Sequence, residues 1–79
     1  MQYKLKIIQA ETIGVVEVKE NSQFNKIRAD KVIVNENITA RLFGRVDNIV
    51  LKKGAKLFLH GRISGAIDNK GGEIFIFKK

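Results

Sequence analysis

The chain lacks cysteine, contains a single histidine and has no long apolar segment. Without cysteine, disulfide bonds, thiolate metal sites and cysteine nucleophiles are all excluded. No apolar run approaches the length needed to span a membrane, and residues 1–10 lack the apolar core and the cleavage site of a signal peptide. We therefore expect a cytoplasmic protein, with a secreted protein free of disulfides as the alternative.

Acidic residues are also scarce, and they are scarcest in the second half of the chain. The sequence holds 15 basic and 8 acidic side chains, which give a net charge of +7, and the basic excess falls in residues 41–79. A basic surface can attract nucleic acid or lipid headgroups. Distributed like charge can instead keep a strand-rich protein soluble and block wrong pairing of strand edges. Because the basic residues are not clustered in one block, the pattern favours the second interpretation.

What the chain does contain is a repeat with a seventeen-residue period. Residues 28–44, 45–61 and 62–78 align without a gap. The aligned positions are Arg28, Arg45 and Arg62; Ala29, Val46 and Ile63; Ile33, Val50 and Ile67; Ala40, Leu57 and Ile74; and Leu42, Leu59 and Ile76. Self-similarity at a fixed period is typical of a solenoid, in which each turn of the chain packs on the next.

Each repeat combines short strand-like segments with bends at constant positions. Residues 35–37, 52–54 and 69–71 contain Asn or Gly, which tolerate the left-handed backbone of a tight corner. Alternating strands follow at residues 39–43, 56–60 and 73–77, and Gly44 and Gly61 mark a second bend. Three straight segments per period describe a triangular rung. We predict an all-β fold, a short right-handed parallel β-helix of about three rungs.

Residues 1–27 keep the period poorly. Residues 3–8 and 15–18 alternate like strands, whereas residues 20–25 are polar and are predicted to form a loop. Terminal repeats are expected to deviate from the pattern of the others. We therefore predict one domain, in which residues 1–27 form an atypical first rung or a cap on the repeat region 28–79. An uncapped end would leave unpaired backbone groups, so chains could also stack on chains.

The triangular rung, the β-branched triplets and the recurring Gly-Arg-Val or Gly-Arg-Ile before each new turn resemble the bactofilins. Bactofilins are small bacterial cytoskeletal proteins with a right-handed β-helix core, and they typically have more rungs than this chain. The resemblance covers residues 26–77 and is carried by the repeat pattern. It implies polymerisation without a nucleotide, through end-to-end stacking of rungs.

The arginine column is the first candidate site. On a parallel stack, Arg28, Arg45 and Arg62 would lie along one edge, where they must face solvent, pair with acids or bind an anion. Asp30 and Asp47 stand two positions further on, and we expect them to neutralise this edge. An anion site is the alternative. Its contacts would be Arg28, Arg45, Arg62, Arg41 and Lys56.

An aromatic ladder is the second candidate. Strict alternation along residues 56–60 and 73–77 turns every second side chain outward, and an exposed apolar ladder predicts contact with another copy or with the N-terminal segment. Beside Arg41, Lys56 and His60, such a ladder could also stack bases. The residues predicted to mediate self-association are Phe58, Phe75, Phe77, Ile74 and Ile76.

No catalytic or metal-binding motif is found in the sequence. His60 falls in a column otherwise occupied by phenylalanines, which favours a packing role over acid–base catalysis. Residues 68–73 do not match the spacing of a calcium loop, and Lys70 would oppose a cation. We predict a self-associating structural or scaffold protein with no enzyme activity and no cofactor. The alternative is a small basic β-domain that binds nucleic acid or a protein partner.

Overall fold

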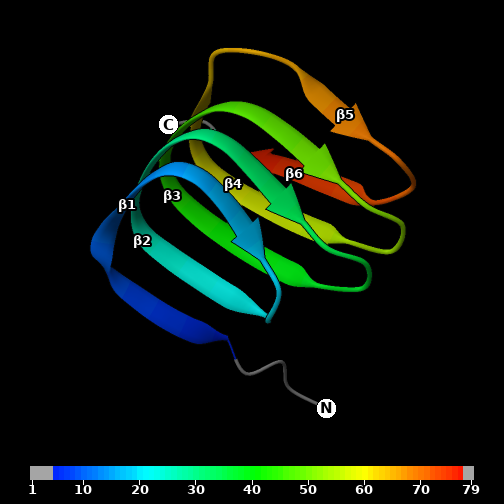
Figure 1. The fold of residues 1–79 in the computed structure, drawn as a ribbon, viewed down its shortest axis with the longest axis horizontal. Coiled ribbons are helices and arrows are strands. Elements are labelled where there is room, and N and C mark those ends of the chain that lie inside the picture. Colours follow the sequence, from blue (N-terminus) through cyan, green and yellow to red (C-terminus); the bar gives the residue numbers. More distant parts are fainter. Residues whose placement is uncertain (1–4, 78–79) are drawn as a thin grey trace.

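The computed structural model describes residues 5–77 as an all-β solenoid, in which parallel strands stack in about four turns (Figure 1). The predicted parallel β-helix is therefore confirmed. No helix in this part of the chain is long and apolar enough to cross a membrane. The strands are β1 (Lys6–Val18), β2 (Ser22–Val34), β3 (Thr39–Leu51), β4 (Lys56–Ile63), β5 (Ile67–Asn69) and β6 (Glu73–Phe77).

A turn of the solenoid consists of one long bent strand and one tight corner. β1, β2 and β3 are 13 residues long, and Figure 1 shows each of them running along one side of the molecule, bending, and returning along the other side. The segments that the sequence predicted as separate are thus joined in one continuous strand. Backbone pairing continues through the bend, because Gly44 keeps its register with Ile27 on one side and Gly61 on the other. Each strand therefore has a first arm and a second arm that face each other across the core.

The tight corners lie where the sequence predicted them. Asn37, Gly54 and Gly71 have φ angles of 61°, 77° and 118°, a backbone region that Gly and Asn adopt most readily. The Asn37 N–H donates to the Lys53 carbonyl oxygen at 3.2 Å, and the Gly54 N–H donates to the Gly71 carbonyl oxygen at 3.0 Å. The corners therefore stack on one another like the strands that they connect.

One predicted column is displaced by a residue. Ile33 pairs with Val50 as expected, but Ile67 pairs with Ile49, and Val50 faces Asp68. The last turn takes one additional residue at the bend near Ser64 and Gly65, so its second arm follows the previous one at a spacing of 18 residues. The other predicted columns are confirmed. They are Arg28, Arg45 and Arg62; Ala29, Val46 and Ile63; Ala40, Leu57 and Ile74; and Leu42, Leu59 and Ile76.

The described part of residues 1–27 contributes a further turn of the solenoid. β1 pairs with β2 in parallel along both arms. Ser22–Val34 is a strand, so the predicted loop at residues 20–25 is wrong beyond Asn21. Phe24 is buried and pairs with Leu42, and a bulge between Phe24 and Ile27 takes up the additional residue. That bulge explains why the seventeen-residue alignment placed Phe24 out of phase.

The core consists of columns of inward-facing apolar side chains that run along the solenoid axis. Its fully buried members come from the middle turns and include Ile27, Val46, Leu51 and Leu57. The turns bury one another, so the interior exists only between turns. The first and last turns therefore each have a side that no further turn of this chain covers.

Candidate functional site

The C-terminal end of the solenoid exposes the inner side chains of its last turn. Ile76 is 43% exposed, whereas Leu59 in the same column is completely buried one turn earlier. Ile67 is 39% exposed, whereas its partner Ile49 is 1% exposed. Both side chains point into the core, and no further turn of the described chain covers them. The predicted self-association residue Ile74 lies in the same turn and is half-buried.

The predicted outward aromatic side chains form two stacked ladders on the first arms of the turns. Phe58 and Phe75 stack with ring centroids 5.1 Å apart. His60 lies between Phe43 and Phe77, with centroid separations of 4.6 and 4.5 Å and nearly parallel planes. His60 therefore has a ring on both of its faces. The last ring of each ladder, Phe75 or Phe77, has one face that no ring of its ladder covers, and that face is at the C-terminal end; the first ring, Phe58 or Phe43, leaves the opposite face uncovered by another ring.

The aromatic ladders become polar toward the N-terminal end. The Arg41 guanidinium carbon lies 6.0 Å from the centre of the Phe58 ring, and one Arg41 amino group donates to Gln23 at 3.4 Å. Gln23 donates to Asn25 at 2.8 Å, and Asn25 donates to Gln9 at 2.9 Å. Arg41 is thus held against the sheet by aromatic and amide partners. The apolar part of this face adjoins the C-terminal end alone.

The arginine column exists, but Asp30 and Asp47 do not form the expected salt bridges with its arginines. Arg28 pairs with Glu11 of the preceding turn at 3.7 Å and not with Asp30. Asp47 accepts a hydrogen bond from the Ser64 hydroxyl. Within residues 5–77, no carboxylate forms a salt bridge with the two later arginines of the column. The other predicted anion contacts lie elsewhere, since Arg41 is on the aromatic face and Lys56 is in register with Glu73.

Charge is distributed unevenly from turn to turn. The first turn, residues 6–21, has two basic and three acidic side chains, and residues 56–77 have three basic and two acidic side chains. The third turn, residues 39–55, has four basic side chains and one acidic side chain. The basic surface is therefore a belt around the middle of the solenoid. The described turns at its two ends have net charges of −1 and +1, and Lys4, Lys78 and Lys79 flank them in the sequence.

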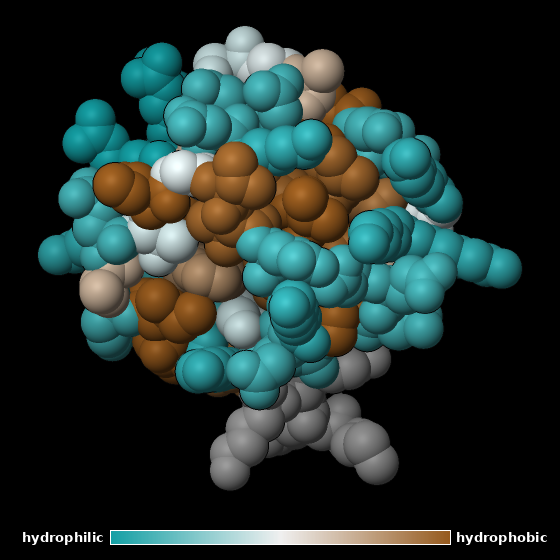
Figure 2. All heavy atoms as spheres, viewed as in Figure 1, coloured by the Kyte–Doolittle hydropathy of each residue, from teal (hydrophilic) through white to brown (hydrophobic). Residues whose placement is uncertain are grey.

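A short apolar stripe lies on the outer side of the second arms. Ile33 and Val50 are half-buried neighbours in register, and Glu17 and Asp68 continue their column on either side. Figure 2 looks onto this side and shows apolar surface over β2 and β3 with hydrophilic surface around it. The stripe is thus bounded by acidic side chains along the column.

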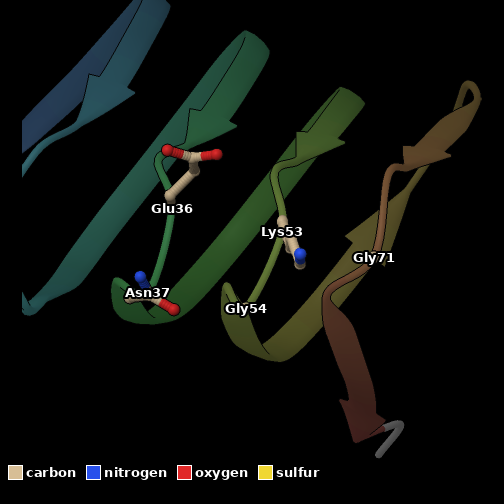
Figure 3. Close-up of a pocket in the computed structure, with 5 residues that line it drawn as sticks. All are labelled: Glu36, Asn37, Lys53, Gly54 and Gly71. Atoms are coloured by element: carbon tan, nitrogen blue, oxygen red, sulfur yellow. The ribbon is translucent and has the colours of Figure 1, made fainter.

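The stacked corners form a shallow depression. Glu36, Asn37, Lys53, Gly54 and Gly71 line it, and Figure 3 shows the Glu36 and Lys53 side chains on successive corners. It contains no histidine, serine, threonine or cysteine. Within residues 5–77, no group of three or more His, Asp or Glu side chains is arranged to hold a metal ion.

Sequence reasoning found the aromatic ladders and missed two exposed groups. Ile67 was assigned to the wrong column, and the apolar side chains of the first turn were not singled out. Ile13 and Val15 on β1 are the most exposed large apolar side chains of the described chain, at 68% each. The signal that was available is the alternation of Ile13, Val15 and Glu17 on one side of a strand.

Comparison with known proteins finds no match among protein-family models, curated proteins or solved structures. The resemblance to bactofilins therefore remains a prediction based on the repeat. The fold and the surfaces described above are the basis for a function.

Proposed function

We propose that this protein is a non-enzymatic structural or scaffold protein that self-associates by stacking solenoid ends on one another. The observation that carries the proposal is the open core of the last turn, where Ile67 and Ile76 are exposed although their column partners are buried. A further turn of a β-solenoid has the shape needed to cover these two side chains. Within residues 5–77, β6 pairs only with β4, so its other edge has backbone groups that no described strand pairs with and that another strand could pair with.

The aromatic ladders support contact at the same end. Phe75 and Phe77 are 40% and 45% exposed and lie beside Ile76. Stacking of planar side chains from turn to turn already occurs within the chain, at about the spacing of neighbouring strands. A further turn from another copy would continue the ladders. This contact uses the residues that the sequence predicted for self-association.

Electrostatics direct association to the ends. Two copies with a net charge of +7 repel each other, and the repulsion is strongest where the basic belts approach. The described end turns carry less net charge than the third turn, so end-to-end approach keeps the belts apart, and only Lys4, Lys78 and Lys79 add positive charge next to the ends in the sequence. Side-by-side association would bring them together.

The magnitude of the apolar contribution predicts a weak, concentration-dependent contact. Full burial of one Ile or Phe side chain contributes about 1.5–3 kcal/mol, so covering four such side chains that are each two-fifths exposed contributes roughly 4 kcal/mol. The loss of rigid-body freedom on association costs at least about that much. Backbone pairing of β6 and the apolar side chains of the second copy must supply the remainder. The resemblance to bactofilins, which implies end-to-end polymers, agrees with this proposal.

Binding of an anionic polymer is a second candidate, and the basic belt favours it. Arg45 and Arg62 have no salt-bridge partner within the described chain and are free to contact phosphates. Base stacking gains little support, because every ring of the two ladders is already stacked on at least one other ring. Such binding would be steeply salt-dependent and weakened by replacing Arg45 and Arg62.

Light-scattering mass over a series of protein concentrations, at low and high salt and with negative-stain images, tests the proposal. We expect a mass that rises with concentration and persists at high salt, with end-to-end assemblies in the images. A monomeric mass at every concentration and salt level contradicts self-association. Salt-sensitive binding of an oligonucleotide by such a monomer would then favour the second candidate.

A further inference from the structure

The two arms of the solenoid end at different layers. Within residues 5–77, the first arms form five layers, from β1, β2, β3, β4 and β6. The second arms form four layers, from β1, β2, β3 and β5, because β5 pairs with β3. The number of arms is therefore odd, and the C-terminal end is a step with β6 as the last layer on one side and β5 as the last layer on the other.

The step exposes one inward side chain on each arm. Ile76 on β6 faces the core at a layer where the described second arm has no strand, and Ile67 on β5 lies below that layer. The two side chains are 43% and 39% exposed, whereas Leu59 and Ile49 are buried one layer earlier in the same columns. A partner that fits this end must therefore add one strand to β5 and one strand to β6 at different layers.

We propose that the C-terminal ends of two copies join about a two-fold axis parallel to the strands, so that β6 of each copy lies on β5 of the other. This proposal rests on the proposed self-association and names the partner of the C-terminal end. The rotation exchanges the two arms, so a stack of five layers from one copy continues into a stack of four from the other on both sides. The two steps then fit together without a gap between arms.

The other ways of joining this end leave a gap. Both arms of β1 belong to the first layer, so a head-to-tail copy whose β1 pairs with β6 leaves β5 without a neighbour. A two-fold axis perpendicular to the strands sets β6 on β6 and holds the two copies of β5 apart. Only the exchange of arms provides a neighbouring strand for β5 and β6 together.

The joined strands run antiparallel and keep the inward side chains in the core. The two arms of a turn run in opposite directions (Figure 1), and rotation about an axis parallel to the strands preserves each direction, so β6 meets β5 of the second copy in the opposite sense. Ile67 and Ile76 lie equally many residues from the corner at Gly71 and Gly72. The exchange of arms therefore places Ile76 of one copy on Ile67 of the other.

The same register brings opposite charges together at the corner. Counting outward from Ile67 and Ile76, Asp68 of each copy faces Phe75 of the other, and Lys70 faces Glu73. Lys70 and Glu73 are both exposed, and Lys70 lies 3.8 Å from Asp68 of its own chain. Because a two-fold contact is isologous, each pair occurs twice. Such exposed ion pairs add little affinity, but they favour this register over its alternatives.

Disulfide trapping tests which strands meet, because the chain has no cysteine of its own. We expect an equimolar mixture of Asp68→Cys and Phe75→Cys to form a covalent dimer on oxidation, since directly opposite residues of an antiparallel pair lie within reach of a disulfide. Neither variant should link to itself. Ile7→Cys is the matched control, because it begins the outward column that ends at Phe75 and is also well exposed.

The alternative contacts give different links. A link between Phe75→Cys and Ile7→Cys would show head-to-tail stacking, and a link of Phe75→Cys to itself would show that equal arms meet. Either result, or assembly of the unmodified chain without any of these links, overturns the proposed two-fold contact while self-association stands. If the unmodified chain never assembles, both proposals fail.

Charge reversal at the corner is an independent test. Lys70→Glu alone sets two carboxylates opposite each other at both corners, and Glu73→Lys alone sets two ammonium groups there. A mixture of the two variants instead pairs opposite charges at both corners. At low salt we expect the equimolar mixture to assemble at a several-fold lower total concentration than either variant alone, measured by light scattering, with circular dichroism to check that each variant is folded. Equal midpoint concentrations for the mixture and the separate variants would overturn this register.

Discussion

Gly61 lies directly against Gly44 of the preceding turn, so closely that a Cβ atom on Gly61 would collide with the Gly44 carbonyl oxygen. Gly44 has the same relationship to the carbonyl oxygen of Ile27. The obstacle in both cases is backbone, which cannot rotate away as a side chain can. Glycine at these positions is what allows the strands to stay paired while each turn bends.

We expect Gly61→Ala to lower the free energy of unfolding by at least about 2 kcal/mol, because the new methyl group must separate two turns or distort the bend. Gly14→Ala is the matched control. Gly14 has a φ of 82° with nothing near its missing Cβ, so this change has only the conformational cost of about 1–2 kcal/mol. Urea denaturation of both variants measures the difference. An alanine at Gly61 that costs less than one at Gly14 would contradict the close approach.

The solenoid was predictable because its main signals repeat locally along the sequence. The arginine column and the corners at Asn37, Gly54 and Gly71 recur at one spacing, and each has a steric or charge requirement that few residue types meet. Two independent signals with the same period are sufficient to specify the stacking of turns. They do not depend on knowing which turn is last.

The bulges and the open ends were not predictable in the same way. An additional residue near Asn25 or Ser64 changes the spacing from 17 to 18 without changing the apolar pattern, so a gapless alignment misplaces Phe24 and Ile67. The exposure of Ile76 is also invisible in the sequence, because Leu59 has the same apolar character and is buried. Burial here is decided by whether a turn follows. The candidate site was thus only partly predicted, through its outward aromatic side chains.

Substitutions along one core column should have very different effects on the monomer. We expect Leu59→Ala to cost about 3 kcal/mol, because it leaves a cavity between two turns. Ile76→Ala in the same column should cost less than about 1.5 kcal/mol at concentrations below assembly, since that side chain is already two-fifths exposed. Thermal or urea unfolding of dilute protein compares them. Equal costs would mean that the last turn is not the open end of the core.

Phe75→Glu should leave the monomer folded and weaken assembly. The Phe75 side chain is well exposed, so the monomer loses mainly its stacking on Phe58. In the assembly, the new carboxylate would be buried without a partner, which is strongly unfavourable. Sedimentation velocity at several concentrations measures the effect, with Val50→Glu as the control on the third turn. Unchanged sedimentation of the Phe75→Glu variant argues against a contact at this end.

Added salt should promote assembly. The contact is mainly apolar, whereas the repulsion between two chains of net charge +7 is electrostatic. At about 0.1 M salt the screening length is about 10 Å, and it shortens to about 3 Å at 1 M, so repulsion between basic belts falls steeply over this range. We expect the midpoint concentration of assembly, measured by light scattering, to fall as salt is raised. A midpoint that rises with salt would indicate a contact formed by ion pairs.

Amide hydrogen exchange should follow the position of each strand in the stack. β3 is paired on both sides, by β2 and by β4 and β5, so its amides should exchange slowest. β5 and β6 have a free edge and few buried side chains, and they should exchange fastest in dilute protein. On assembly, stacking of solenoid ends should protect β6, together with β1 where the N-terminal end takes part in the contact, because pairing at a strand edge slows exchange. Protection gained by β6 alone would show that two C-terminal ends meet, and protection gained by neither would show that the copies join through their sides.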